Sequence, residues 1–186
     1  MKYQRNRHNA GFLVLNYFAE SHSLSFKPAK GDYYFCEGSI EGYRFFLIKP
    51  TTYVNGSGIA AKQFVESYEI EVKDLLVVCD DVNLETGKLR VRKSGGDGGH
   101  NGLASIIYHL NSDQFPRLRF GIGNDFEQGF LSDYVLSDFT ENEQNILQGS
   151  IKNASNLIKE FIWGGIDAML IANSKLYNEN KSSEIS

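Results

Sequence analysis

The stretch Leu75-Leu76-Val77-Val78-Cys79 is followed directly by Asp80-Asp81. A short, continuous apolar run is typical of a strand buried on both faces, and we expect it to stop at the aspartates. Apolar and aromatic runs around it predict further strands at 33–36, 43–48, 88–92 and 118–122, the first two forming a hairpin through 37–42. Helical spacing of apolar residues predicts helices at 9–20 and 59–68 and from 101 and 140 onward. Strands alternating with helices predict an α/β fold with helices on both faces of the sheet.

The length of 186 residues suits a single domain, which we place at residues 1–177. Thr140 and Glu143 have the spacing of a capping box, which predicts a helix start, and Gly164-Gly165 predicts a second turn. The polar segment 178–186 is predicted to be a disordered tail.

The composition is that of an ordinary soluble protein, with 41% hydrophobic and 23% charged residues. No run approaches the roughly 18 apolar residues of a membrane span, and no signal-peptide pattern is present, so we expect a cytoplasmic protein without a membrane partner. Cys36 and Cys79 lie in apolar segments without C-x-x-C spacing, which favours buried thiols over a disulfide framework or zinc site.

A glycine-rich stretch follows, Ser94-Gly95-Gly96-Asp97-Gly98-Gly99-His100-Asn101-Gly102-Leu103. Glycine at this density predicts positive φ or a close backbone approach, although a tight turn alone would also explain it. The stretch lacks the lysine of a phosphate loop and the spacing of a dinucleotide fingerprint. With Asn101 as the expected N-cap, it delivers two polar side chains to a helix N-terminus.

The net charge of −4 gives no global indication of nucleic-acid binding. Two local segments are basic: Lys88, Arg90, Arg92 and Lys93 in the first, and Arg117 and Arg119 in the second. On strands, alternate residues share a face, so each segment predicts a basic strip. Such strips are usually solvated faces, but two of them flanking a glycine-rich loop favour a phosphate-bearing partner.

Four polar residues stand at predicted element boundaries: His8, Asn55, Asp80 and Asn101. Singly, the asparagines could be N-caps, Asp80 a turn residue and His8 a core histidine. Together they suggest more, because a carboxylate beside an imidazole makes histidine a general base near neutral pH. With no nucleophile elbow and no cluster at metal-ligand spacing, we hypothesise a hydrolase that uses water and needs no metal or cofactor.

Several motifs in order resemble bacterial peptidyl-tRNA hydrolase. They are Arg7-His8-Asn9-Ala10-Gly11-Phe12, 49–58 from Lys-Pro-Thr-Thr-Tyr to Asn-Gly-Ser-Gly, Asp80-Asp81-Val82-Asn83-Leu84, the stretch 95–103, Arg117–Gly123 and Asp133-Tyr134-Val135-Leu136. The resemblance implies a monomeric α/β domain with a twisted mixed sheet. It also implies hydrolysis of the ester that joins a peptide to the 3′ ribose of tRNA in N-blocked peptidyl-tRNA, which recycles tRNA from drop-off peptides.

The same resemblance assigns residues one by one. His8 matches the general base and Asp80 the carboxylate that holds it, while Asn55 and Asn101 match residues that bind the substrate and position its peptide and the water. The remaining matches are to substrate- and tRNA-binding positions: Tyr3 and Tyr53 in the cleft, His100 beside Asn101, and Arg92 and Arg119 on a tRNA phosphate.

The chain departs from the family pattern at its start, where an apolar strand and a Gly-x-Gly-Asn-Pro-Gly loop are expected before Tyr3 and Met1-Lys2 stands instead. We expect the natural chain to extend further. The alternatives to an active esterase are a non-catalytic RNA- or protein-binding relative of the same fold and an N-terminally truncated, inactive form. A generic nucleotide-binding domain is disfavoured by the missing phosphate-loop lysine.

Overall fold

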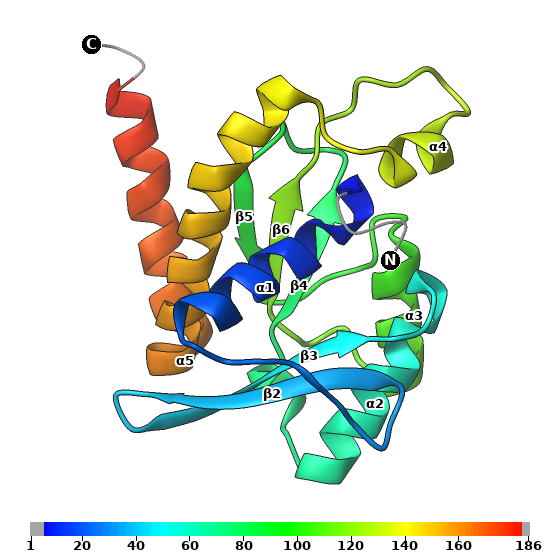
Figure 1. Cartoon of the computed structure of the whole chain (residues 1–186), viewed down its shortest axis with the longest axis vertical. Coiled ribbons are helices and arrows are strands. Elements are labelled where there is room, and N and C mark those ends of the chain that lie inside the picture. The colour runs from blue at the N-terminus through cyan, green and yellow to red at the C-terminus, as the bar shows by residue number, and fades with distance from the viewer. Residues whose placement is uncertain (1–5, 184–186) are drawn as a thin grey trace. The chain divides into compact units, whose positions relative to one another are not determined.

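The computed structural model describes residues 6–183, with side chains to Asn178. The helices are η1 Arg7–Asn9, α1 Ala10–Ser21, η2 Val54–Gly56, α2 Ser57–Tyr68, η3 Val72–Asp74, α3 Asn101–Leu110, α4 Leu131–Leu136 and α5 Glu141–Ser183. The strands are β1 Lys27–Pro28, β2 Tyr33–Ile40, β3 Tyr43–Pro50, β4 Val77–Asp81, β5 Leu89–Arg92 and β6 Arg117–Gly121. This order of elements confirms the α/β class (Figure 1).

The described strands form two three-stranded sheets where the sequence suggested one. One has the order β1-β2-β3 and the other the order β4-β6-β5. The chain divides into two compact units. The first contains the residues up to Tyr17, residues Val78–Val91 and the residues from Leu118 onward. The second contains residues Phe18–Val77 and Arg92–Arg117.

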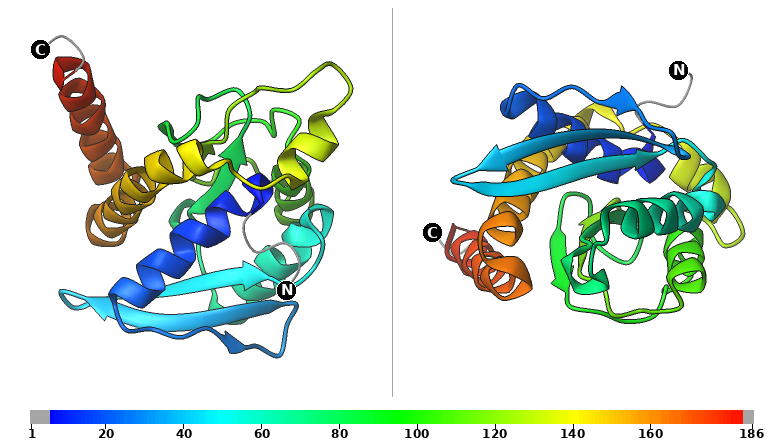
Figure 2. Two further views of the ribbon diagram at one scale, coloured as in Figure 1. Left: turned by 45° about the horizontal axis from the view of Figure 1, so that its top comes forward. Right: turned by 90° about the horizontal axis from the view of Figure 1, so that it is seen from below.

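In the first unit, α1 lies across β4 and β6 (Figure 1). Gly11 permits this, because a Cβ there would lie 2.4 Å from the carbonyl oxygen of Val78. The core beneath is fully buried, with Val14, Leu118 and Phe120 at most 1% exposed. Helix α5 breaks at Gly164-Gly165, where φ is −135° and +65°, and the chain then doubles back (Figure 2). The second turn predicted there is confirmed.

In the second unit, β2 and β3 form an antiparallel hairpin in register from Tyr33↔Pro50 to Ile40↔Tyr43. Tyr33, Ala60 and Phe64 form its buried core. Helices α2 and α3 lie side by side (Figure 2) because Gly58 has no side chain: a Cβ there would be 2.1 Å from the Ser105 carbonyl oxygen.

The predicted boundaries of three elements were wrong, each for a local reason. The hairpin turn spans only residues 41–42, because Glu41 and Gly42 both take positive φ and allow a two-residue connection. Strand β4 runs on through Asp81, and both aspartates are buried there with partners on other elements, His8 and Arg119. Helical structure begins two residues before the predicted start at residue 9, because the turn η1 is capped by Asn6, whose side-chain oxygen accepts a hydrogen bond from the Asn9 backbone N–H at 3.1 Å.

Residues 178–183, which we expected to be disordered, continue α5 to Ser183. Extending an existing helix requires fixing only one residue per added hydrogen bond, so a polar sequence can follow a nucleated helix. In the part of the chain from 6 to 183, no helix combines the length and apolar character needed to cross a bilayer.

Candidate active site

His8 and Asp80 lie together in the first unit. The Nδ1 atom of His8 is 2.8 Å from Oδ1 of Asp80. The Asp80 side chain is 5% exposed, while that of His8 is 19% exposed and so remains reachable by water. The structure therefore brings together the two residues that the sequence suggested as a base and its orienting carboxylate.

Two local features place this pair. His8 sits in η1, the single turn that enters α1, and Asp80 lies near the end of β4. The close approach of Gly11 to Val78 sets α1 against β4. Because Gly11 follows His8 by about one turn and Val78 precedes Asp80 by two residues, this approach also fixes the distance between the two side chains.

The hydrogen bond fixes the tautomer of the imidazole. An ionised carboxylate can only accept, so Nδ1 of His8 carries the proton and donates to Asp80, and Nε2 carries the lone pair. Burial lowers the pKa of His8, but the hydrogen bond to Asp80 and the charge of Asp80 outweigh it, so the pKa lies above 6.5. This arrangement suits a base that accepts a proton from water and is stabilised once charged.

Asn55 and Tyr53 lie around η2 in the second unit. Asn55 is exposed and is not an N-cap: Gly56 occupies that position of α2 and makes no side-chain cap. Tyr53 is 91% exposed. In the described part of the chain the Asn55 carboxamide makes no hydrogen bond, which leaves it available to a ligand.

The expectation that Asn101 caps α3 was wrong. His100 is the cap, and its Nδ1 accepts a hydrogen bond from the Leu103 backbone N–H at 3.2 Å. Asn101 is the first helical residue, is exposed, and its carboxamide has no hydrogen-bond partner among residues 6–183. Elements η2 and α3 pack together in this unit, which brings the segments of Asn55 and Asn101 side by side.

The two arginines assigned to a tRNA phosphate differ in their surroundings. Arg92 is exposed at the end of β5. Arg119 is largely buried, and its Nε is 3.0 Å from Oδ2 of Asp81 in an ion pair. Tyr3 lies outside the described residues.

The second predicted basic strip is not a surface strip, because Arg117 is only 2% exposed. Its guanidinium donates to the Gly96 carbonyl at 2.6 Å and to the Asp113 carbonyl at 3.3 Å, and lies over the Phe115 ring. Arg117 thus anchors the glycine-rich loop. In that loop Gly95, Gly98 and Gly99 have positive φ, as the glycine density predicted.

Sequence reasoning also missed Arg7, which is 5% exposed and pairs with Glu143. Glu143 was expected only as the acid of a capping box. That box is present, since the Thr140 backbone N–H and hydroxyl both donate to Oε2 of Glu143 at 2.8 Å. No local pattern signals the pairing with Arg7, because the partners are far apart in sequence.

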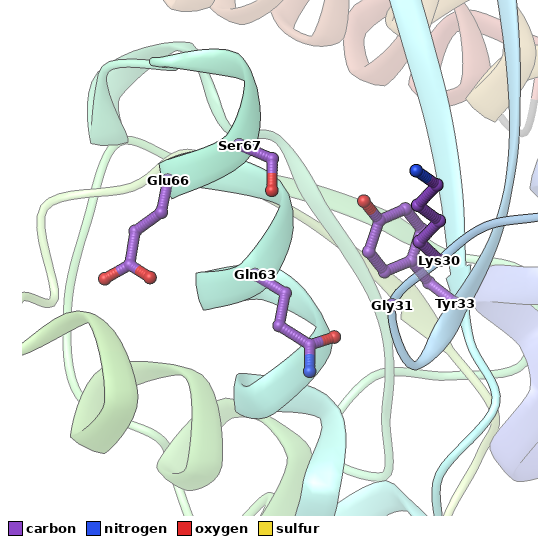
Figure 3. A pocket seen from close by; sticks show the side chains of 6 residues that line it. All are labelled: Lys30, Gly31, Tyr33, Gln63, Glu66 and Ser67. Atoms are coloured by element: carbon purple, nitrogen blue, oxygen red, sulfur yellow. The ribbon is translucent and has the colours of Figure 1, made fainter.

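A separate pocket of about 440 Å³ lies within the second unit (Figure 3). Gln63, Glu66 and Ser67 line it from α2, opposite Lys30 and Tyr33. None of the predicted site residues lines this pocket.

An α/β fold that carries a carboxylate-oriented imidazole with access to water has the features expected of a hydrolase. Residues 1–183 match the family model of peptidyl-tRNA hydrolase. The chain belongs to the peptidyl-tRNA hydrolase family.

Relatives with this name are similar over most of their length. The peptidyl-tRNA hydrolase of Lachnospira eligens is 38% identical over 167 residues, which is 90% of each chain. That of Thermoanaerobacter pseudethanolicus is 39% identical over 166 residues, 89% of each chain. The crystal structure of peptidyl-tRNA hydrolase from Acinetobacter baumannii superposes with a TM-score of 0.87 at 34% identity, covering 93% of this chain and 89% of that one.

Proposed function

We propose that this protein hydrolyses the ester between the peptide and the 3′ ribose of tRNA in N-blocked peptidyl-tRNA. Family membership supports the substrate class. The observation that supports the mechanism is the 2.8 Å contact between His8 and Asp80, which orients the imidazole of His8 and leaves the lone pair on its Nε2.

In the proposed reaction, Nε2 of His8 takes a proton from water as the water oxygen attacks the ester carbonyl carbon. The carbon–oxygen bond to the ribose then breaks, and the 3′ oxygen takes up the proton from the imidazolium. Asp80 stabilises the imidazolium while it is charged. The ester of an aminoacyl-type linkage is already activated, so a positioned water and a base suffice.

Substrate binding is assigned to the exposed polar and aromatic residues that match the family pattern. Asn55 and Asn101 would hold the peptide and the water, with Tyr53 and His100 beside them, and carboxamides do so without adding charge. We propose no metal or cofactor. A substrate made by ribosomes supports the proposal of a cytoplasmic protein, and we propose that it works as a monomer.

Arg92 and Arg119 are the proposed contacts to a tRNA phosphate. Arg92 is the stronger candidate, because it is exposed whereas Arg119 is largely buried. We expect Arg92→Ala to reduce the salt dependence of tRNA binding by about one phosphate, and Arg119→Ala to reduce it less. Filter binding between low and moderate salt measures both slopes.

The test of the activity is release of tRNA from an N-acetylated aminoacyl-tRNA. We expect His8→Ala to lower kcat by about 10²- to 10⁴-fold, the usual contribution of a general base. His22→Ala removes the same side chain elsewhere and should leave the rate unchanged. Equal rates for His8→Ala and wild type would remove His8 as the base. A folded wild-type protein without activity would favour a non-catalytic, binding relative.

A further inference from the structure

We infer that Glu143 is a positioning residue for the general base: it holds Arg7, and through Arg7 the single turn that carries His8. The catalytic meaning of this inference rests on the proposed function. The contacts that carry it all lie within the first unit.

Glu143 and Arg7 form a bidentate salt bridge. Nη1 of Arg7 donates to Oε1 of Glu143 at 2.6 Å, and Nη2 donates to Oε2 at 2.8 Å. The Arg7 side chain is 6% exposed and that of Glu143 is 19% exposed. A forked pair of this kind fixes orientation as well as distance, and little water competes for it.

The other groups of Arg7 are held as firmly. Its Nε donates to the Ser137 hydroxyl at 3.2 Å, and its Nη1 also donates to the Ile122 carbonyl at 3.2 Å. The guanidinium lies over the rings of Tyr134 and Phe139, and the backbone N–H of Arg7 donates to the Ser137 carbonyl at 3.0 Å. Because η1 is only Arg7–Asn9, fixing Arg7 on all sides leaves His8 little freedom of its own.

The same cluster reaches the strand that carries Asp80. Oε1 of Glu143 accepts from the Thr86 hydroxyl at 3.2 Å, and Thr86 follows β4 in the chain. Ile122, whose carbonyl accepts from Arg7, donates its backbone N–H to the Asp81 carbonyl at 3.1 Å. Glu143 therefore contacts Arg7, in the turn that carries His8, and Thr86, in the loop that follows the strand of Asp80.

A capping role alone does not account for this arrangement. A capping box needs only the reciprocal contacts between Thr140 and Glu143. Here the carboxylate also meets Arg7 and Thr86, on other elements. Both roles predict a loss of stability when Glu143 is changed, but only the positioning role predicts a change in His8 itself.

Glu143→Asp tests the inference because it keeps the charge and shortens the reach by one methylene. We expect kcat on N-acetylated aminoacyl-tRNA to fall about 10- to 100-fold with little change in KM, as for a slightly misplaced catalytic group. We also expect the pKa of His8, followed by NMR on the full chain and assigned with His8→Ala, to fall toward 6.5 as its bond to Asp80 loosens. The NMR readout does not depend on activity, so it separates this inference from the proposed function.

Thr140→Ala is the matched control. It removes one hydroxyl contact to the same carboxylate and weakens the cap of α5, but leaves the pair with Arg7. We expect its thermal unfolding temperature to fall while kcat and the His8 titration stay at wild-type values. Arg7→Lys keeps the positive charge but loses the bidentate geometry of the guanidinium, and it should behave like Glu143→Asp. It tests the same inference if Glu143→Asp does not fold. An unchanged His8 titration in a folded Glu143→Asp or Arg7→Lys protein would overturn the inference.

Discussion

In the proposed mechanism, the charge of the His8 imidazole decides at which pH water can be activated. The base must be neutral to accept a proton, so activity rises with pH through the pKa of His8. Asp80 holds that pKa above 6.5 against the effect of burial. In that mechanism Asp80 would shift the onset of activity to higher pH, make the base stronger and keep it in the productive tautomer.

Asp80→Asn should separate these two effects. Without the negative charge the pKa of His8 falls, so the acid limb of kcat/KM against pH should move to lower pH. The plateau should drop by about 10²- to 10⁴-fold, because an amide can donate to Nδ1 and favour the wrong tautomer. Asp81→Asn removes the adjacent buried carboxylate, which pairs with Arg119, and should leave the limb in place. A limb that stays in place in Asp80→Asn would contradict the assignment.

At the scale of secondary-structure elements, the geometry of the site depends on how closely α1 approaches β4. Gly11 is the residue that permits this approach, since any larger residue would meet the Val78 carbonyl. The sequence placed Gly11 on a helix but gave no reason for it to be glycine. The reason is visible only when the strand is in place.

Gly11→Ala should therefore impair both stability and activity. A methyl group 2.4 Å from a carbonyl oxygen forces the helix away, and we expect a loss of about 1–3 kcal/mol in the free energy of unfolding by urea. Because η1 moves with α1, kcat should fall as well. Gly149→Ala has open space around the added methyl in an exposed helix position and should stabilise by about 0.5–1 kcal/mol with unchanged kcat. A Gly11→Ala protein as stable as wild type would disprove the packing argument.

For the whole molecule, the sequence predicted the α/β class and the pairing partners His8 and Asp80, because these follow from alternating patterns and from polar residues at strand and helix ends. It mistook Arg117 for a surface residue. Charge patterning cannot tell a solvated guanidinium from one whose protons are taken by backbone carbonyls, here those of Gly96 and Asp113. It likewise gave Asn101 the capping role of His100, because asparagine is a preferred N-cap residue and histidine is not, whereas here Nδ1 of His100 accepts from the Leu103 backbone N–H.

For the same reason, the sequence did not predict the pairing of Arg7 with Glu143. This ion pair links the site to the stability of the whole chain. The forked contact with Arg7 and the bonds from Thr140 overcome the opposing effect of burial and lower the pKa of Glu143 from 4.5 to about 2. A lowered folded-state pKa stabilises the protein above the unfolded value, and this contribution is lost as pH falls through the folded value. His8, with its raised pKa, acts in a separate window: its contribution is present below pH 6.5 and is lost as pH rises through its folded pKa.

Acid should therefore unfold this protein partly through Glu143. Between about pH 4.5 and 2 we expect the free energy of unfolding to fall by at most about 3 kcal/mol from this one group, since each unit of pKa shift corresponds to about 1.4 kcal/mol. Glu143→Gln should be less stable than wild type at neutral pH but should lose less on acidification, so the two curves converge near pH 2. Glu141→Gln changes an exposed carboxylate in the same helical turn and should run parallel to wild type. Urea unfolding at a series of pH values measures all three, and parallel curves for wild type and Glu143→Gln would show that the ion pair with Arg7 contributes no acid sensitivity.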